Sequence, residues 1–140
     1  PAQELQVTFD EGHGDMVVLR DISFYSMCEH HLIPFFGSAS IGYLPNGSVV
    51  GVSKMVRALE MLAHRPQLQE RLTAQLADAL LDTLHPDGVA VVLKAEHLCM
   101  SMRGVQKPGT KVVTSAVRGS FRRESLNRRE ILTLLGGGTE

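Results

Sequence analysis

The sequence SKMVRALEMLAHRPQLQERLTAQLADAL occupies residues 53–80 and predicts two consecutive helices. In its first half, Met55, Leu59 and Leu62 recur at i, i+4 and i+7, and charged residues lie between them. This is the pattern of an amphipathic helix, and Ser53 is well placed as its N-cap. Pro66 predicts the end of this helix and the opening of a second, because proline is tolerated in a first turn but not in a helix interior.

The second helix is marked by a leucine stripe, and strand patterns flank the helical pair on both sides. The stripe consists of Leu68, Leu72, Leu76 and Leu80. Strand formers dominate four segments, which are residues 15–27, 36–43, 89–102 and 111–121. A short helix is predicted over 127–135. The order β-β-α-α-β-β predicts an α+β domain, an antiparallel four-stranded sheet with two antiparallel helices on one face.

Length and composition favour one ordinary globular domain over residues 1–140, with a flexible glycine-rich tail from about 136. Of the 140 residues, 44% are hydrophobic and 21% charged, and the net charge is −1, which argues against a nucleic-acid partner. No apolar run is long enough to cross a membrane, and residues 1–10 lack a signal-peptide pattern, so a cytoplasmic protein is expected. The open edges of a small sheet favour a homo-oligomer.

Both cysteines of the chain have histidine neighbours, which predicts a metal site. Cys28-Glu29-His30-His31 is a Cys-x-x-His pair with a second histidine inside it, and His97 precedes Cys99 by two residues. Three thiolate or imidazole ligands would leave one tetrahedral position of Zn²⁺ open for water, as in catalytic zinc sites. Two alternatives stay open: one disulfide, and a structural zinc whose fourth ligand is a further histidine. His13, His64 and His85 are read as ordinary surface or core residues.

Two polar clusters are candidates for ligand binding. Ser53, Lys54 and Arg57 at the start of the first helix, with Arg103, would suit a phosphate, although the simpler reading is a solvated helix face. Glu70, in the second helix, could accept two N–H bonds from a guanine edge, or could belong to an exposed polar face. Spacing alone does not choose between these readings.

Several stretches of the chain resemble the GTP cyclohydrolase I family, in order along nearly the whole sequence. The matching stretches are SMCEHHLIPF (26–35), IGYLP (41–45), GVSK (51–54), RPQLQERLT (65–73) and HLCMSMRGV (97–105). The resemblance implies the tunnelling fold, whose subunits join in rings, and a homodecamer of two pentameric rings with active sites at subunit boundaries. It also implies the conversion of GTP and water to 7,8-dihydroneopterin triphosphate and formate, the first step of pterin and folate synthesis.

Residue roles follow from the same resemblance. Cys28, His31 and Cys99 would bind zinc, and the water activated by the metal would attack C8 of guanine. His97 would act as acid and base beside N7, and His30 would protonate the ribose ring oxygen.

Substrate contacts are implied in the same way. Glu70, with Gln69 nearby, would hold the pyrimidine edge of guanine. The triphosphate would be met by Ser53, Lys54, Arg57 and Arg103, and Ser53 would also assist rearrangement of the opened ribose.

The family usually has a helical segment before this domain, and the chain begins at Pro1 without one, as a truncated or naturally shortened form would. Two rival hypotheses are another tunnelling-fold enzyme with a cysteine nucleophile, such as a pterin synthase or nitrile reductase, and a non-catalytic ring stabilised by zinc.

Overall fold

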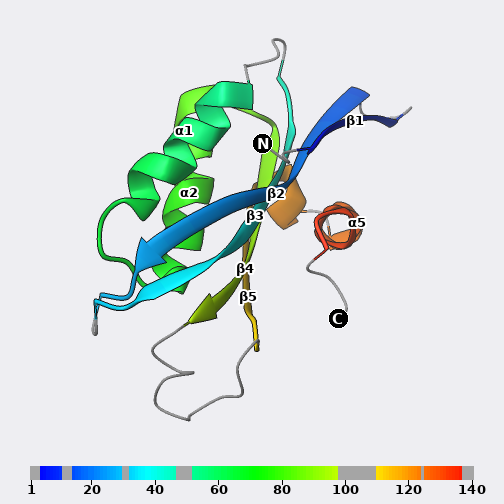
Figure 1. Ribbon diagram of the computed structural model, residues 1–140. Helices are drawn as coiled ribbons and strands as arrows, with labels where there is room; N and C mark the ends of the chain where they lie inside the picture. The colour runs from blue at the N-terminus through cyan, green and yellow to red at the C-terminus, as the bar shows by residue number, and fades with distance from the viewer. Residues whose placement is uncertain are drawn as a thin grey trace.

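The computed structural model describes residues 4–10, 14–29, 32–46, 52–97, 110–123 and 125–136. Five strands and four helices are present in these ranges (Figure 1). In chain order they are β1 (Glu4–Asp10), β2 (Gly14–Met27), β3 (Pro34–Leu44), α1 (Val52–Ala63), α2 (Gln69–Leu84), β4 (Gly88–His97), β5 (Val112–Gly119), α4 (Ser120–Arg123) and α5 (Ser125–Leu134). The predicted order β-β-α-α-β-β is confirmed for β2 to β5.

The strands form one antiparallel sheet in the order β1-β2-β3-β4-β5. The sequence prediction of four strands did not include β1, which pairs with β2 in unbroken register from Glu4↔Arg20 to Asp10↔Gly14. Alternation of Leu5, Val7 and Phe9 with polar residues was the signal for it. The sheet therefore has five strands, and β1 and β5 form its two edges within the described chain.

The two predicted helices cover one face of the sheet (Figure 1), and the main core lies between these helices and the sheet. Leu59 on α1 and Leu72 and Leu76 on α2 are completely buried in one cluster with Ile41 and Val91 of the sheet. Each leucine contributes roughly 1.5–3 kcal/mol by leaving water. This core fixes α2 against β4 and β5, and it thereby fixes the end of the sheet at which His97 lies.

A second, smaller core lies on the opposite face of the sheet, under the C-terminal helices. Phe121, Ile131 and Leu135 pack there against Val92 and other sheet residues. The prediction of one continuous strand over 111–121 was wrong at its end. Gly119 has φ 73°, a left-handed conformation that stops the strand, and α4 begins at the next residue.

The helix boundaries differ slightly from those predicted. Ser53 is the second residue of α1 and not its N-cap, because the helix begins at Val52. Leu68 occupies the N-cap position of α2 and lies outside that helix. Pro66 follows the end of α1 as expected, but it does not open the second helix, since α2 begins three residues later at Gln69. None of the helices within the described ranges is long and apolar enough to cross a membrane.

Candidate active site

Cys28 lies at the end of β2, where the backbone reverses before β3 begins. Its N–H donates to the carbonyl of Ile33 at 2.9 Å, and its own carbonyl accepts from the N–H of Leu32 at 2.7 Å. Leu32 has φ 53°, which allows the chain to close this tight turn. The thiol-bearing side chain is 8% exposed. A turn closed between residues 28 and 33 is what a Cys-x-x-His metal pair requires.

This turn is tied to the connector between α1 and α2 through the backbone of Gln67. The Gln67 N–H donates to the Met27 carbonyl at 2.8 Å, and the Gln67 carbonyl accepts from the Glu29 N–H at 2.9 Å. The Gln67 side chain is 1% exposed, and its amide donates to the Leu62 carbonyl at 2.9 Å and to Gln75 Oε1 at 3.1 Å. Sequence reasoning missed Gln67, because its role depends on a contact between distant segments.

His97 is the last residue of β4 and is partly buried. Its ring stacks on Phe35, with centroids 4.6 Å apart and planes 5° apart, and Nε2 lies 2.6 Å from Gln69 Oε1. Phe35 itself is completely buried and meets Phe24 edge-on. Burial lowers the pKa of His97 below its usual 6.5, and the negative charge of Glu70 offsets part of that shift by raising it. The ring is therefore held in a fixed plane and favours the neutral form.

Gln69 and Glu70 are neighbours in the first turn of α2 but have opposite surroundings. Gln69 is 2% exposed and its amide is bonded to groups on β4 and β5. Glu70 is exposed and lines a cavity of about 420 Å³ between α2 and β5, together with Thr73, Ala74 and residues 114–118. That volume lies within the range of small-molecule sites. Arg118 on the β5 side is engaged in an ion pair with Asp78 at 2.8 Å.

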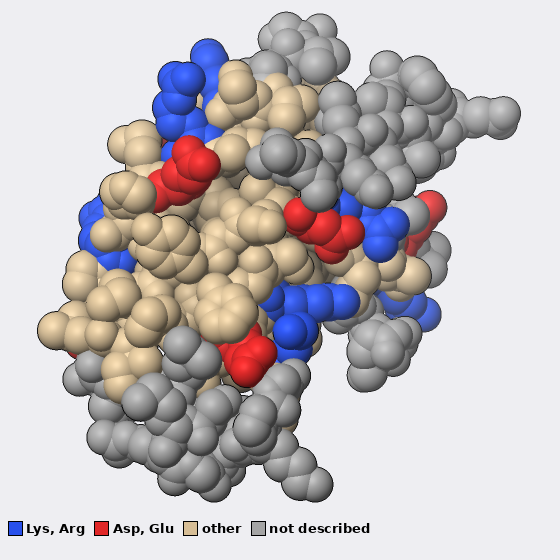
Figure 2. Space-filling model, in the orientation of Figure 1, with Lys and Arg blue, Asp and Glu red and all other residues tan. Residues whose placement is uncertain are grey.

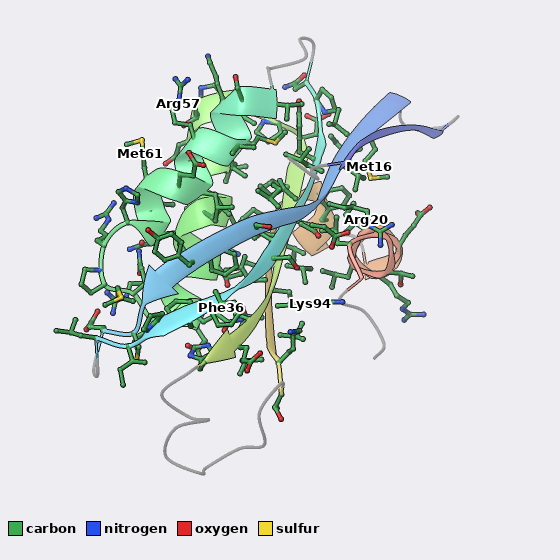
Figure 3. All side chains as sticks on the ribbon, in the orientation of Figure 1. Met16, Arg20, Phe36, Arg57, Met61 and Lys94 are labelled. Carbon is green, nitrogen blue, oxygen red and sulfur yellow. The ribbon has the colours of Figure 1, made fainter. Side chains whose placement is uncertain are left out.

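Ser53, Lys54 and Arg57 are all exposed near the start of α1, at the other end of the molecule from His97 (Figure 1). The end of α1 and the following connector adjoin the Cys28 turn, and the ten residue steps from Ser53 to Ala63 span about 15 Å of helix. Arg57 projects outward from α1 in Figure 3, and Figure 2 shows basic side chains on the surface over this helix. Within one subunit, Ser53, Lys54 and Arg57 therefore lie away from His97.

The remaining predicted site residues, His30, His31, Cys99 and Arg103, lie outside the described residues. No group of three possible metal ligands occurs among the side chains that the structure does describe. Cys28 is the only predicted zinc ligand among the described residues, so the ligand set stays a prediction. His64 and His85 are exposed, and His85 caps the end of α2 in a left-handed conformation.

Comparison with known proteins relates nearly the whole chain to one family. The family model described as GTP cyclohydrolase I matches residues 1–136. A GTP cyclohydrolase 1 of Geobacillus sp. (strain WCH70) is 56% identical over 138 residues, covering 98% of this chain and 73% of the relative. A GTP cyclohydrolase 1 of Streptococcus pyogenes is 54% identical over 136 residues, covering 96% of this chain and 70% of the relative.

A solved structure, that of the archaeosine synthase QueF-Like in the apo form, resembles the fold. Its TM-score is 0.59 at 21% identity, over 75% of this chain and 94% of that chain. This likeness supports the tunnelling fold and, at that identity, nothing further. The family match and the relatives together decide the assignment: the chain belongs to the GTP cyclohydrolase I family, which is a family of enzymes.

Proposed function

We propose that residues 1–140 form one catalytic domain that converts GTP and water to 7,8-dihydroneopterin triphosphate and formate. The observation that carries this proposal is the 56% identity, over 98% of the chain, to a GTP cyclohydrolase 1. The closeness of His97 to Glu70, which lines a cavity large enough for a small molecule, supports it. The alternative of a different tunnelling-fold enzyme rests only on the weaker likeness at 21% identity.

Cys28, His31 and Cys99 are proposed to hold Zn²⁺. The Cys28 turn fits this role, because it brings a buried thiol to the end of a strand and reverses the chain over residues 28–33. Zinc, when bound, supplies the Lewis acidity that makes water nucleophilic near neutral pH. Thiolate ligands must stay reduced, which favours the cytoplasm as the compartment.

The protein's own groups are proposed to recognise guanine and to move protons. Glu70 would accept hydrogen bonds from the pyrimidine edge, since its carboxylate is exposed at the cavity. His97 would exchange a proton with N7 as the imidazole ring opens, and His30 would protonate the ribose ring oxygen. A fixed ring plane suits His97 to this task, because proton transfer requires a positioned nitrogen.

Ser53, Lys54, Arg57 and Arg103 are proposed to bind the triphosphate, with Ser53 also assisting the ribose rearrangement. Because the start of α1 lies far from His97 in the same chain, we infer that another subunit supplies Ser53, Lys54 and Arg57. The open edges at β1 and β5 offer surfaces on which sheets could join. Joining at these edges would fit a ring of subunits, and the proposed assembly is a homodecamer of two pentameric rings with active sites between subunits.

The test of the reaction is incubation of the purified protein with GTP, with and without a zinc chelator. Formate and a fluorescent oxidised pterin are measured together. We expect both products in equal amounts, and neither after chelation until zinc is restored. GTP consumption without formate would disprove the proposed reaction.

Mixed assembly tests the shared site separately. Lys54→Ala and His97→Asn variants, each expected to be nearly inactive, are unfolded, mixed and refolded together. If one subunit supplies the phosphate contacts and another supplies His97, the mixture regains a fraction of the wild-type rate. If both groups act within one chain, the mixture stays as inactive as its parents.

A further inference from the structure

The side chain of Gln69 lies behind His97 and bonds to two strands. Its Oε1 lies 2.6 Å from His97 Nε2. Its Nε2 donates to the Val112 carbonyl at 2.9 Å and to Thr114 Oγ1 at 3.1 Å, with the Leu93 carbonyl at 3.4 Å. With 2% of the residue exposed, both ends of the amide are already occupied by protein.

These partners settle which way the amide faces. The carbonyls of Val112 and Leu93 only accept hydrogen bonds, so the atom that faces them has to be the amide nitrogen. The opposite orientation would place Gln69 Oε1 against two carbonyl oxygens and leave its NH₂ facing His97. The amide oxygen is therefore the atom that His97 meets.

Two threonines confirm this assignment of donors and acceptors. The Thr73 hydroxyl donates to the Gln69 carbonyl at 2.8 Å, so in its 2.7 Å contact with Thr114 it can only accept. The Thr114 hydroxyl thus donates its hydrogen bond to Thr73 Oγ1 and accepts one from Gln69 Nε2. Each hydroxyl hydrogen then has an acceptor, and the two amide hydrogens of Gln69 are shared among the Val112 carbonyl, Thr114 Oγ1 and the more distant Leu93 carbonyl.

An amide oxygen accepts and never donates, so Nε2 of His97 has to carry the hydrogen in the contact with Gln69. In neutral His97 the lone pair then belongs to Nδ1. Stacking on Phe35 prevents the ring from rotating out of this arrangement. The network therefore distinguishes the two nitrogens of the ring.

We propose that Gln69 is a positioning residue, which holds His97 as the Nε2–H tautomer and leaves Nδ1 as the nitrogen that acts on the substrate. This role differs from the one that the family resemblance implies for Gln69, which is to contact guanine together with Glu70. The proposal rests on the proposed function only in giving His97 its role in the reaction. The tautomer itself follows from the hydrogen bonds.

The first test is nitrogen-15 NMR of the wild-type protein with labelled histidine at a pH where imidazole is neutral. The His97 signals are assigned by their loss in His97→Asn. We expect one-bond coupling of the ring hydrogen to Nε2. A hydrogen on Nδ1 would overturn the proposal. This measurement does not require turnover, so it stays decisive even if the protein makes no formate from GTP.

The second test separates positioning from substrate contact by kinetics. Gln69→Met keeps the length of the side chain but removes the acceptor, and we expect kcat to fall about 10- to 100-fold with KM for GTP nearly unchanged. Gln69→Glu keeps an acceptor against Nε2 but turns its second carboxyl oxygen toward the Val112 and Leu93 carbonyls, so it should recover part of that kcat only at low pH, where this oxygen is protonated and can donate. Circular dichroism and unfolding temperature establish that each variant is folded. A raised KM with unchanged kcat in Gln69→Met would instead show that Gln69 contacts the substrate.

Discussion

The Cys28 turn and the His97 end of β4 lie at the same end of the sheet but are held in place by different means. Backbone groups of Met27, Glu29 and Gln67 bond the Cys28 turn to the helix connector. His97 is held by side chains, through the amide of Gln69 and the ring of Phe35. The first arrangement depends little on side-chain identity, whereas the second depends on it entirely.

This difference predicts how each region responds to substitution. Backbone hydrogen bonds persist when a side chain is changed. Single substitutions near Cys28 should therefore lower the free energy of unfolding but leave the conformation of the turn largely unchanged. Around His97, loss of the Gln69 amide oxygen removes the hydrogen bond that keeps the ring hydrogen on Nε2. Substitutions there should lower the catalytic rate more than the free energy of unfolding.

The largest effect is expected from His97→Asn. Removing the proposed acid and base should lower the rate of formate release by about 10²- to 10⁴-fold, with zinc content unchanged. The matched control is His64→Asn, because His64 is exposed in the connector after α1. Loss of zinc from His97→Asn, measured by atomic absorption, would make His97 a ligand and would break the contrast between the two regions.

Glu70→Gln should have the next largest effect, on GTP binding. A charge-assisted hydrogen bond contributes about 1.5–3 kcal/mol, so affinity should fall by roughly 10- to 100-fold. Calorimetric titration of the zinc-free protein with GTP measures this without turnover. Glu60→Gln, at an exposed position on α1, is the control and should bind GTP normally. If Glu70→Gln and Glu60→Gln bind GTP with equal affinity, Glu70 does not contribute to guanine recognition.

Gln67→Leu tests the backbone-held region. The variant loses two side-chain hydrogen bonds and leaves the Leu62 carbonyl without its donor, so we expect a loss of about 1–3 kcal/mol in the free energy of unfolding, measured with urea. Zinc affinity should change far less, since the backbone bonds to Met27 and Glu29 remain. Gln75→Leu, which removes only one of the bonds, should cost less. A collapse of zinc binding in Gln67→Leu would mean that the backbone contacts alone do not hold the turn.

The smallest effect is expected at the ion pair of Arg71 with Glu29, which also links α2 to the Cys28 turn. Their side chains are 39% and 41% exposed, and pairs of this kind contribute about 0–1 kcal/mol. A double-mutant cycle of Arg71→Gln and Glu29→Gln should give a coupling energy in that range that shrinks as salt is added. A larger, salt-independent coupling would make this turn depend on side chains after all.

Much of the fold was predictable because its signals are local. The leucine stripe of α2, the break at Pro66 and the strand patterns each extend over a few neighbouring residues. The pairing of β1 was missed although its alternation was present, and the stop at Gly119 depends on a backbone angle that composition does not reveal. At the site, the residue types of Glu70 and His97 were informative, but the burial of Gln69 beside the exposed Glu70 was not predictable from their spacing.

The sequence by itself determined the family of this protein, the order of its central elements and the residues with chemistry suited to metal, proton transfer and guanine. Only the tertiary structure decided that Gln69 faces His97 and that Gln67 anchors the Cys28 turn. It also showed that the start of α1 lies away from both. The physical reason is distance along the chain: the hydrogen bonds of Gln69 join residues 24 to 45 positions apart, and such contacts exist only after the helices have packed on the sheet.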